Sequence, residues 1–477
     1  MLFKEMMNCK NELLANIAIR GVTSDSRKVE KDFVFVCIKG TVSDGHDYAA
    51  MACEKGAAVI VAERDLGIDR QVIVPDTHAV YSRLCAKWFG EPARSLKLVG
   101  VTGTNGKTSV TYMLKAILEA QGEKVGLIGT IQNMIDQETI PAKNTTPDAY
   151  ELNSLFALMR DKGCGYAIME VSSHALDQRR VNELEFETAI FTNLTQDHLD
   201  YHITMENYLE AKKRLFTMCK TAVVNVDDEY APQLMDGLLC NTVTYSTGDF
   251  SDYCAKGINY RPASVDYELL SNNGIKHVKV NTGGKFTVYN SMAAIVAAKT
   301  LGISVESSAE ALAELRGVKG RAEVVPCDRD FTIIIDYAHT PDGLKNILST
   351  FKECPKNRLI VLFGCGGDRD RTKRPIMGSI AVRNADFVIV TSDNPRTEEP
   401  SAIIDDIIEG ISGTRTPYKV IENRIEAIKY AVTIAQKDDI IVLAGKGHET
   451  YQDIGGHKYH LDEREEIAEH LAQRYPV

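Results

Sequence analysis

The sequence lacks several features that would each indicate a particular class of protein. It contains no run of about 18 apolar residues, so we expect no membrane-spanning helix. The N-terminus, MLFKEMMNCKNELL, lacks the apolar core and cleavage site of a signal peptide. Positive charge is not in excess: the net charge is −11, and the basic face that binds nucleic acid is missing. We therefore expect a cytoplasmic protein with no nucleic-acid partner.

The eleven cysteines include no Cys-x-x-Cys pair, which argues against a disulfide or zinc framework and favours reduced thiols. Hydrophobic residues make up 44% and charged residues 25% of the chain, as is usual for a soluble globular protein. A chain of 477 residues is long enough for about three domains.

The most informative stretch is residues 98–118, LVGVTGTNGKTSVTYMLKAIL. The apolar run 96–101 predicts a buried strand, and the apolar residues of 110–118 recur at helical spacing. The segment between them is then a strand-to-helix turn, which directs backbone N–H groups at an anion. In such a turn Lys107 reaches phosphate oxygens and Thr108 ligates Mg²⁺. We predict a nucleoside triphosphate site formed by Gly103, Thr104, Asn105, Gly106, Lys107, Thr108 and Ser109.

The match to the general phosphate-loop pattern is incomplete. Val101 stands where that pattern has its first glycine, and Gly103 supplies the turn instead. A glycine-rich turn without a ligand is the alternative. The strand–turn–helix context favours the phosphate site.

The form TGTNGKT resembles the ATP loop of the Mur ligases and of their folylpolyglutamate and cyanophycin synthetase relatives. Five more segments resemble this family: SDSR at 24–27, EVSSHALDQRRV at 170–181, NLTQDHLD at 193–200, YLEAKKRLF at 208–216 and DNPR at 393–396. The resemblance implies three α/β domains. These are a small uridine-nucleotide-binding domain (1–88), a central P-loop ATPase-type parallel-sheet domain (89–319) and a Rossmann-like amino-acid-binding domain (320–477).

The resemblance also implies a reaction, an ATP-dependent amide ligation in cytoplasmic peptidoglycan precursor synthesis. The D-glutamyl carboxylate of UDP-N-acetylmuramoyl-L-alanyl-D-glutamate would take the γ-phosphoryl group of ATP. The amine of meso-2,6-diaminopimelate would then attack the acyl phosphate. Mg²⁺ is the expected cofactor, and we expect a monomer.

The resemblance places Asn290, Arg321 and Asp336 at ATP. Arg321 would lie near the γ-phosphate and Asp336 near the ribose. The residues that it assigns to the UDP-sugar peptide are Ser26, Asn144, Thr145, Thr146, Ser172, Gln178 and Arg180. Plainer interpretations stay open. Thr145 and Thr146 could be helix caps, and Asn290 could be the N-cap of an Ala-rich helix. Residues 172–180 could form an ordinary loop, and the N-terminal unit could be a docking module.

A metal site is predicted where two strands end. Glu170 ends an apolar strand, where an unpaired carboxylate is costly and a metal is an economical partner. His198 follows the next strand, although a single histidine is more often structural. By spacing alone Lys212 is one of several charges on a solvated helix, 206–218; the resemblance makes it a carbamylated metal ligand. Thr108, Glu170, His198 and Lys212 are the expected ligands, the last three at a second Mg²⁺. These three, with Lys107, are the expected catalytic residues.

In the last third of the chain, apolar runs at 332–335, 359–363, 387–390 and 440–443 predict parallel strands. Each is followed by a polar or glycine-rich turn, the position at which open parallel sheets bind ligands. The resemblance assigns diaminopimelate to Arg369, Asp393, Asn394, Arg396, Gly445 and Glu449. Arg396 would pair with the distal carboxylate that lysine lacks. The alternative is a surface ion pair of Arg396 with Glu398 or Glu399.

Two other functions were weighed. A different amino-acid ligase, such as a folylpolyglutamate synthetase, would not need the uridine-type segment at 24–27 or the DNPR segment. A nucleotide-binding switch would have no reason to place further polar turns at several strand ends. A ligase should release ADP only with both co-substrates, whereas a switch hydrolyses ATP alone.

Overall fold

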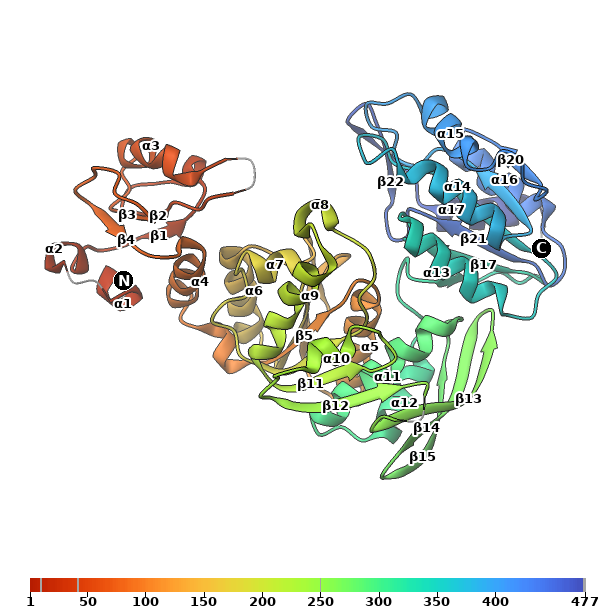
Figure 1. Cartoon of the computed structure of the whole chain (residues 1–477), viewed down its shortest axis with the longest axis horizontal. Coiled ribbons are helices and arrows are strands. Elements are labelled where there is room, and N and C mark those ends of the chain that lie inside the picture. The colour runs from red at the N-terminus through yellow and green to blue at the C-terminus, as the bar shows by residue number, and fades with distance from the viewer. Residues whose placement is uncertain (9–10, 41–42, 249, 475–477) are drawn as a thin grey trace. The chain divides into compact units, whose positions relative to one another are not determined.

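The computed structural model describes residues 1–477 except 9–10, 41–42, 249 and 475–477. The chain divides into two compact units, each with its own strands and helices (Figure 1). Unit 1 comprises Met1–Thr244 with Ala297–Ile303, and unit 2 comprises Tyr245–Val296 with Ser304–Val477. The predicted domain boundaries at residues 88 and 319 stay a prediction.

Unit 1 begins with a four-stranded parallel sheet, ordered β1-β2-β3-β4, that has helices on both faces. Val34 and Val36 pack in one core cluster with Leu84 of α4, while Phe35 packs in a second cluster with Ala52 of α3. This is the alternation expected of a strand covered on both sides. The elements are α1 (Phe3–Met6), α2 (Glu12–Ala15), β1 (Gly21–Thr23), η1 (Ser26–Lys28), β2 (Phe33–Val36), η2 (Gly45–Tyr48), α3 (Ala49–Glu54), β3 (Val59–Ala62), β4 (Gln71–Ile73) and α4 (Thr77–Trp88).

A larger sheet follows in unit 1, ordered β11-β10-β5-β9-β6-β7-β8. The strands β11, β10, β5, β9 and β6 are parallel to one another, whereas β7 runs antiparallel to both of its neighbours, β6 and β8. Because β9 and β10 flank β5, the turns after these three strands meet at one edge. The elements are η3 (Pro92–Ser95), β5 (Lys97–Thr102), α5 (Lys107–Ala120), β6 (Val125–Ile128), β7 (Gln132–Ile135), β8 (Glu138–Pro141), α6 (Ala149–Asp161), β9 (Tyr166–Glu170), α7 (Ser173–Asp177), β10 (Phe186–Phe191), α8 (Leu199–His202), α9 (Met205–Lys213), η4 (Arg214–Thr217), β11 (Cys219–Asn225), α10 (Ala231–Met235) and β12 (Asn241–Ser246), which ends in unit 2.

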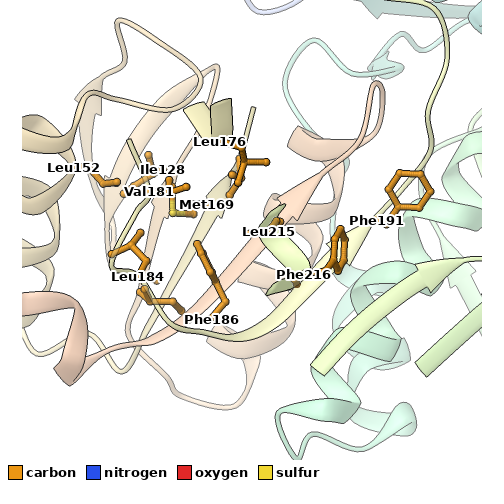
Figure 2. Close-up of a cluster of buried hydrophobic side chains, with 14 of the residues drawn as sticks. Ile128, Leu152, Met169, Leu176, Val181, Leu184, Phe186, Phe191, Leu215 and Phe216 are labelled. Atoms are coloured by element: carbon orange, nitrogen blue, oxygen red, sulfur yellow. The ribbon is translucent and has the colours of Figure 1, made fainter. Parts of the chain in front are cut away.

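The core of this sheet is a cluster of buried apolar side chains (Figure 2). Met169 and Phe186 from the strands pack with Leu152 of α6, Leu176 of α7 and Phe216 of η4. Helix α5 buries the apolar residues whose spacing predicted it. The strand–turn–helix unit is therefore anchored in the interior, and its turn has a fixed position.

Unit 2 begins with an antiparallel arrangement of β13, β14 and β15, with the end of β12 parallel to β13. The elements are β13 (Tyr253–Arg261), β14 (Ser264–Ser271), β15 (Gly274–Val280), α11 (Lys285–Thr300), whose last turn belongs to unit 1, and α12 (Val305–Glu314). Because α11 starts at Lys285, Asn290 lies inside the helix. The interpretation of Asn290 as an N-cap is therefore wrong.

The rest of unit 2 is a six-stranded sheet, ordered β16-β17-β21-β18-β19-β20 and parallel except for β16. Helices α13, α14 and α15 cover one face, and α16 and α17 cover the other. The four predicted strands are confirmed. The elements are β16 (Glu323–Val325), β17 (Thr332–Asp336), α13 (Pro341–Lys352), β18 (Leu359–Phe363), α14 (Lys373–Asn384), β19 (Phe387–Val390), α15 (Pro400–Glu409), β20 (Tyr418–Val420), α16 (Arg424–Ile434), β21 (Ile440–Ala444), β22 (Tyr451–Ile454), β23 (His457–His460) and α17 (Glu463–Arg474).

Two further local interpretations are wrong. Thr145 and Thr146 do not cap α6, because Asp148 is the N-cap and its side chain accepts a hydrogen bond from the Glu151 N–H. The helix predicted at 206–218 is shorter: α9 ends at Lys213, and a 3₁₀ turn follows. Within the described residues, none of the helices has the length and apolar character needed to cross a membrane.

Candidate functional site

The turn between β5 and α5 has the backbone geometry that its glycines predict. Gly103 has φ 144° and Gly106 has φ 87°, both in the region that glycine adopts most easily. A Cβ atom on Gly103 would lie 1.9 Å from the Thr192 hydroxyl oxygen. A side chain at position 103 would therefore displace the turn.

The turn is braced by the segment after β10. The Thr104 N–H donates to the Asn193 carbonyl oxygen at 2.9 Å, and the Asn105 N–H donates to Asn193 Oδ1 at 2.9 Å. Thr104 Oγ1 donates to the Thr195 carbonyl oxygen at 3.1 Å. Sequence reasoning did not select Asn193 or Thr195. The available signal was that both residues lie in the family-like segment 193–200, directly after a predicted strand.

Two lysines converge on one carbonyl of this turn. Lys107 Nζ and Lys212 Nζ donate to the Gly103 oxygen at 2.9 and 3.0 Å, and Lys107 also donates to the Thr104 oxygen at 2.8 Å. Lys212 is 1% exposed, so the expectation of a solvated face is wrong for it. Burial lowers the pKa of Lys212 well below its ordinary value, and the charge of Lys107 lowers it further.

Glu170, at the end of β9, is 1% exposed. Its carboxylate accepts hydrogen bonds from Thr108 Oγ1 at 2.9 Å, from the Thr130 N–H at 2.9 Å and from Thr130 Oγ1 at 3.0 Å. These donors stabilise a buried charge. The premise that Glu170 would be unpaired without a metal is therefore wrong, and Thr130 is a partner that sequence reasoning missed. In the described part of the chain, no group of three or more His, Cys, Asp or Glu residues is placed to hold a metal ion.

His198 lies in an aromatic cluster around Tyr208. The His198 and Tyr208 ring centroids are 6.1 Å apart, and Lys212 Nζ lies 4.4 Å from the Tyr208 ring centroid. Tyr208 Oη is 3.2 Å from Thr104 Oγ1. Burial lowers the pKa of His198, and Lys107 and Lys212 lower it further. The charges of both lysines thus act on His198. Tyr208 joins this group; in the sequence it was noted only as the first residue of the family-like segment 208–216.

Five of the residues assigned to the UDP-sugar peptide lie together beside Glu170. Thr146 Oγ1 donates to the Glu170 carbonyl oxygen at 2.8 Å and accepts from the Ser172 N–H at 3.0 Å. Arg180 donates through Nη1 to the Thr146 carbonyl oxygen at 2.9 Å and through Nε to Gln178 Oε1 at 3.0 Å.

Thr145, the fifth, reaches the same group through Thr130, since their hydroxyl oxygens are 3.1 Å apart. Ser172 also caps α7, so its capping and binding interpretations are compatible. Asn144 is exposed in the loop before Thr145. Ser26 lies in η1, where its carbonyl oxygen accepts from Lys55 Nζ at 2.9 Å.

In unit 2, Asp336 ends β17 and accepts from the Ala322 and Ala338 N–H groups at 2.7 and 2.9 Å. Burial raises the pKa of Asp336. The Arg321 guanidinium lies 4.8 Å from the centroid of the Tyr337 ring. Arg321 and Asp336 thus lie at the same end of β17, as their assignment to one ligand requires. Asn290 is buried within α11.

The turns after β19 and β21 are joined by side chains. Asn394 Nδ2 donates to Glu449 Oε2 at 2.9 Å. Gly445 has φ 119°, and a Cβ atom there would lie 2.4 Å from Asp393 Oδ2. The fold therefore brings Asp393, Asn394, Gly445 and Glu449 together.

Arg396 has φ 53° and donates through Nη1 to the Gly367 carbonyl oxygen at 2.5 Å. Glu398 instead pairs with Arg374, and Arg374 Nη2 lies 2.8 Å from Glu398 Oε1. This contradicts the alternative in which Glu398 is the partner of Arg396. Arg369 is exposed and donates to the Asp368 carbonyl oxygen at 3.1 Å.

Sequence reasoning missed Lys446 in this group. Its side chain is 0% exposed, and Nζ lies 3.0 Å from Asn394 Oδ1 and 3.3 Å from Glu449 Oε2. The feature of the sequence that could have indicated Lys446 is a lysine between two glycines directly after an apolar strand.

Three family models match this chain: "Mur ligase family, catalytic domain" at residues 18–87, "Mur ligase middle domain" at 101–298 and "Mur ligase, glutamate ligase domain" at 320–447. The chain belongs to the Mur ligase family. Membership confirms the predicted fold class, a three-domain α/β architecture with N-terminal, middle and C-terminal parts.

Its curated relatives within the Mur ligase family match over nearly their whole length. A protein of Caldanaerobacter subterraneus subsp. tengcongensis is 48% identical over 463 residues, 96% of each chain, and one of Clostridioides difficile is 44% identical over 475 residues, 98% of each chain. Both are named UDP-N-acetylmuramoyl-L-alanyl-D-glutamate--2,6-diaminopimelate ligase.

Solved Mur ligase structures agree in fold. A structure named for the same ligase is 34% identical, with a TM-score of 0.76 and 100% coverage of both chains. A MurF ligase from Thermotoga maritima in complex with ADP is 21% identical, with a TM-score of 0.62 and coverage of 95% and 98%; it shows the fold alone.

Proposed function

We propose that this protein is the ATP-dependent ligase that adds meso-diaminopimelate to UDP-N-acetylmuramoyl-L-alanyl-D-glutamate in peptidoglycan precursor synthesis. One observation supports it most: the phosphate turn, the Thr108–Glu170 pair and the Thr146–Arg180 group are joined by hydrogen bonds in unit 1. A phosphate site thus adjoins a polar site that can hold a carboxylate-bearing substrate. The names of relatives at 44–48% identity support the choice of substrates.

The chemistry follows from these positions. The backbone N–H groups of the turn would bind the ATP phosphates. Lys107 would exchange its two carbonyl partners for phosphate oxygens, where it stabilises the negative charge as the γ-phosphoryl group passes to the D-glutamyl carboxylate. Attack by the diaminopimelate amine on the acyl carbon then forms the amide, loses a proton and expels phosphate.

The oxygen donors of Thr108 and Glu170 fit Mg²⁺. We infer that Thr108 would hold one Mg²⁺, and that Glu170, His198 and carbamylated Lys212 would hold a second. A bound Mg²⁺ would neutralise charge on the phosphoryl oxygens.

Lys212 would serve as a ligand after carbamylation. A protonated amine cannot react with CO₂, whereas a neutral amine adds to it and releases a proton. The lowered pKa of Lys212 increases the neutral fraction. The carbamate would then replace a cation near Lys107 by an anion, which the neighbouring positive charge favours.

The remaining assignments are part of this proposal. Ser26 would lie at the uracil, and Asn144, Thr145, Thr146, Ser172, Gln178 and Arg180 would hold the sugar peptide. Asn290, Arg321 and Asp336 would contact ATP. Arg369, Asp393, Asn394, Arg396, Gly445 and Glu449 would hold diaminopimelate. The three domains would be 1–88, 89–319 and 320–477, in a cytoplasmic monomer.

The test is a phosphate-release assay with ATP, Mg²⁺ and UDP-N-acetylmuramoyl-L-alanyl-D-glutamate. Each reaction adds one amino acid: meso-diaminopimelate, LL-diaminopimelate, L-lysine or none. We expect release that depends on both co-substrates and is fastest with the meso isomer, with a tripeptide product of the corresponding mass. Release without the amino acid, or a preference for lysine, would contradict the proposal.

A further inference from the structure

Lys446 lies in the turn after β21 and points inward from it. Its side chain is 0% exposed, and its Nζ lies within 3.9 Å of Asp393 Oδ1 as well as near Asn394 and Glu449. A buried ammonium is stable only when its surroundings supply acceptors. Here those acceptors are three of the residues that the proposed function assigns to the amino acid.

These contacts determine the orientation of the Asn394 amide. Its Oδ1 accepts from Lys446 Nζ at 3.0 Å and from the Asp453 N–H at 2.9 Å. Because both partners are donors, the oxygen faces them and the NH₂ group faces Glu449 Oε2 at 2.9 Å. Glu449 Oε2 in turn accepts from both Asn394 and Lys446, so one cation orients both side chains.

We propose that Lys446 is a positioning residue for amino-acid selectivity. It holds Asn394 and Glu449 in the orientation that binds the distal ammonium and carboxylate of the incoming amino acid. This inference rests on the proposed function. Without the cation, the Asn394 amide can rotate and Glu449 can turn toward solvent, so the two side chains no longer form one prearranged site.

The turns themselves do not depend on Lys446, because a second buried cation holds their backbone. Arg424 pairs with Glu463, both 0% exposed, at 2.7 Å. It also donates to the carbonyl oxygens of Ala444 at 3.0 Å and Ser392 at 3.4 Å. Removal of Lys446 should therefore disturb side-chain orientation more than the fold.

The experiment compares Lys446→Met with Lys458→Met in the full-length protein. Lys446 Nζ and Lys458 Nζ lie 5.7 and 4.0 Å from the centroid of the same Tyr451 ring, but Lys458 is exposed. KM for each of the three substrates, kcat and the meso-diaminopimelate over L-lysine ratio of kcat/KM are measured. For Lys446→Met we expect KM for diaminopimelate to rise and the ratio to fall, each by about tenfold or more. The KM of Lys446→Met for ATP should stay unchanged. All the kinetic values of Lys458→Met should match those of wild type.

A double variant tests whether Lys446 acts through Asn394. In an Asn394→Ala background, Lys446→Met should lower the ratio much less than in wild type. If Lys446→Met does not fold, as judged by its melting curve, Lys446→Gln keeps an N–H donor and should retain a ratio nearer to wild type. An unchanged ratio, or an equal rise in all three KM values, would overturn the inference. If wild type itself does not ligate diaminopimelate, the proposed function fails instead.

Discussion

The two candidate sites surround their buried lysines, Lys212 and Lys446, with different acceptors. In unit 1, buried Lys212 and partly buried Lys107 donate to main-chain carbonyls, and burial lowers the pKa of Lys212. In unit 2, Lys446 lies beside carboxylates, and Arg374 binds Glu398, which raises the pKa of Arg374. A carbonyl compensates a cation less completely than a carboxylate does.

The difference suggests two roles. Cations that donate to carbonyl oxygens keep their net positive charge and so attract a polyanion. The unit 1 site therefore suits a nucleoside triphosphate. Cations paired with carboxylates contribute order rather than net charge, so the unit 2 site suits selection of a zwitterion by shape and hydrogen bonding. Four variants test this comparison.

The largest effect is expected for Lys107→Ala. Loss of a cation that stabilises charge in the transition state should lower ligation by about 10³-fold or more. Melting behaviour should match wild type, since the lysine is not part of the core. The control is Lys97→Ala, at the exposed start of β5, the strand that precedes this turn. Near-normal turnover in Lys107→Ala would break the assignment of unit 1 to phosphate chemistry.

Lys212→Ala should come next. Loss of a metal ligand should reduce activity by about 10²- to 10³-fold, with partial rescue by short-chain carboxylates that can occupy the position of the carbamate. Lys213→Ala, at the next position of α9, is the control, because Lys213 Nζ donates only outside this site, to the Gln233 carbonyl oxygen. A high-resolution structure with nucleotide bound and an ordered, unmodified amine at 212 would count against carbamylation.

Arg396→Ala should act on selectivity rather than on turnover in general. A bidentate guanidinium–carboxylate pair supports a preference for meso-diaminopimelate over L-lysine of about 10²-fold, which the variant should lose. The measurement is the ratio of kcat/KM values, and exposed Arg415→Ala is the control. If the variant keeps the full preference, the assignment of Arg396 is wrong.

The smallest effect concerns stability and pH. The hydrogen bond from Arg374 lowers the pKa of Glu398 from 4.5 to about 2. Because the folded-state pKa is below that of the unfolded chain, the pair stabilises the fold above about pH 4.5 and loses this effect as pH falls toward 2. Glu398 is 23% exposed, so we expect Glu398→Gln to cost only about 1–2 kcal/mol at pH 7.

The measurement is the melting temperature of wild type and Glu398→Gln at pH 7 and pH 3.5. The gap between them should shrink at the lower pH, while exposed Glu399→Gln should show no gap at either. A gap that widens on acidification would mean that Glu398 does not stabilise unit 2 as an anion.

Much of the fold could be predicted because its signals are local. The apolar run before Gly103 and the helical spacing after Lys107 specify a strand, a turn and a helix without reference to distant residues. The errors at the start of α6, at Asn290 and at the end of α9 are all at element boundaries. Boundaries depend on which side chain caps a terminus, and several neighbouring residues compete for that role.

The sequence by itself determined the strand–turn–helix unit, the polar turns after the strands and, through resemblance, the family. Only the tertiary structure decided that Lys107 and Lys212 share the Gly103 carbonyl, that Thr130 stabilises Glu170 and that Lys446 lies beneath Asn394. The physical reason is burial. A lysine in the sequence has one expected environment, water, and only packing against residues far away in the chain replaces that water with specific acceptors.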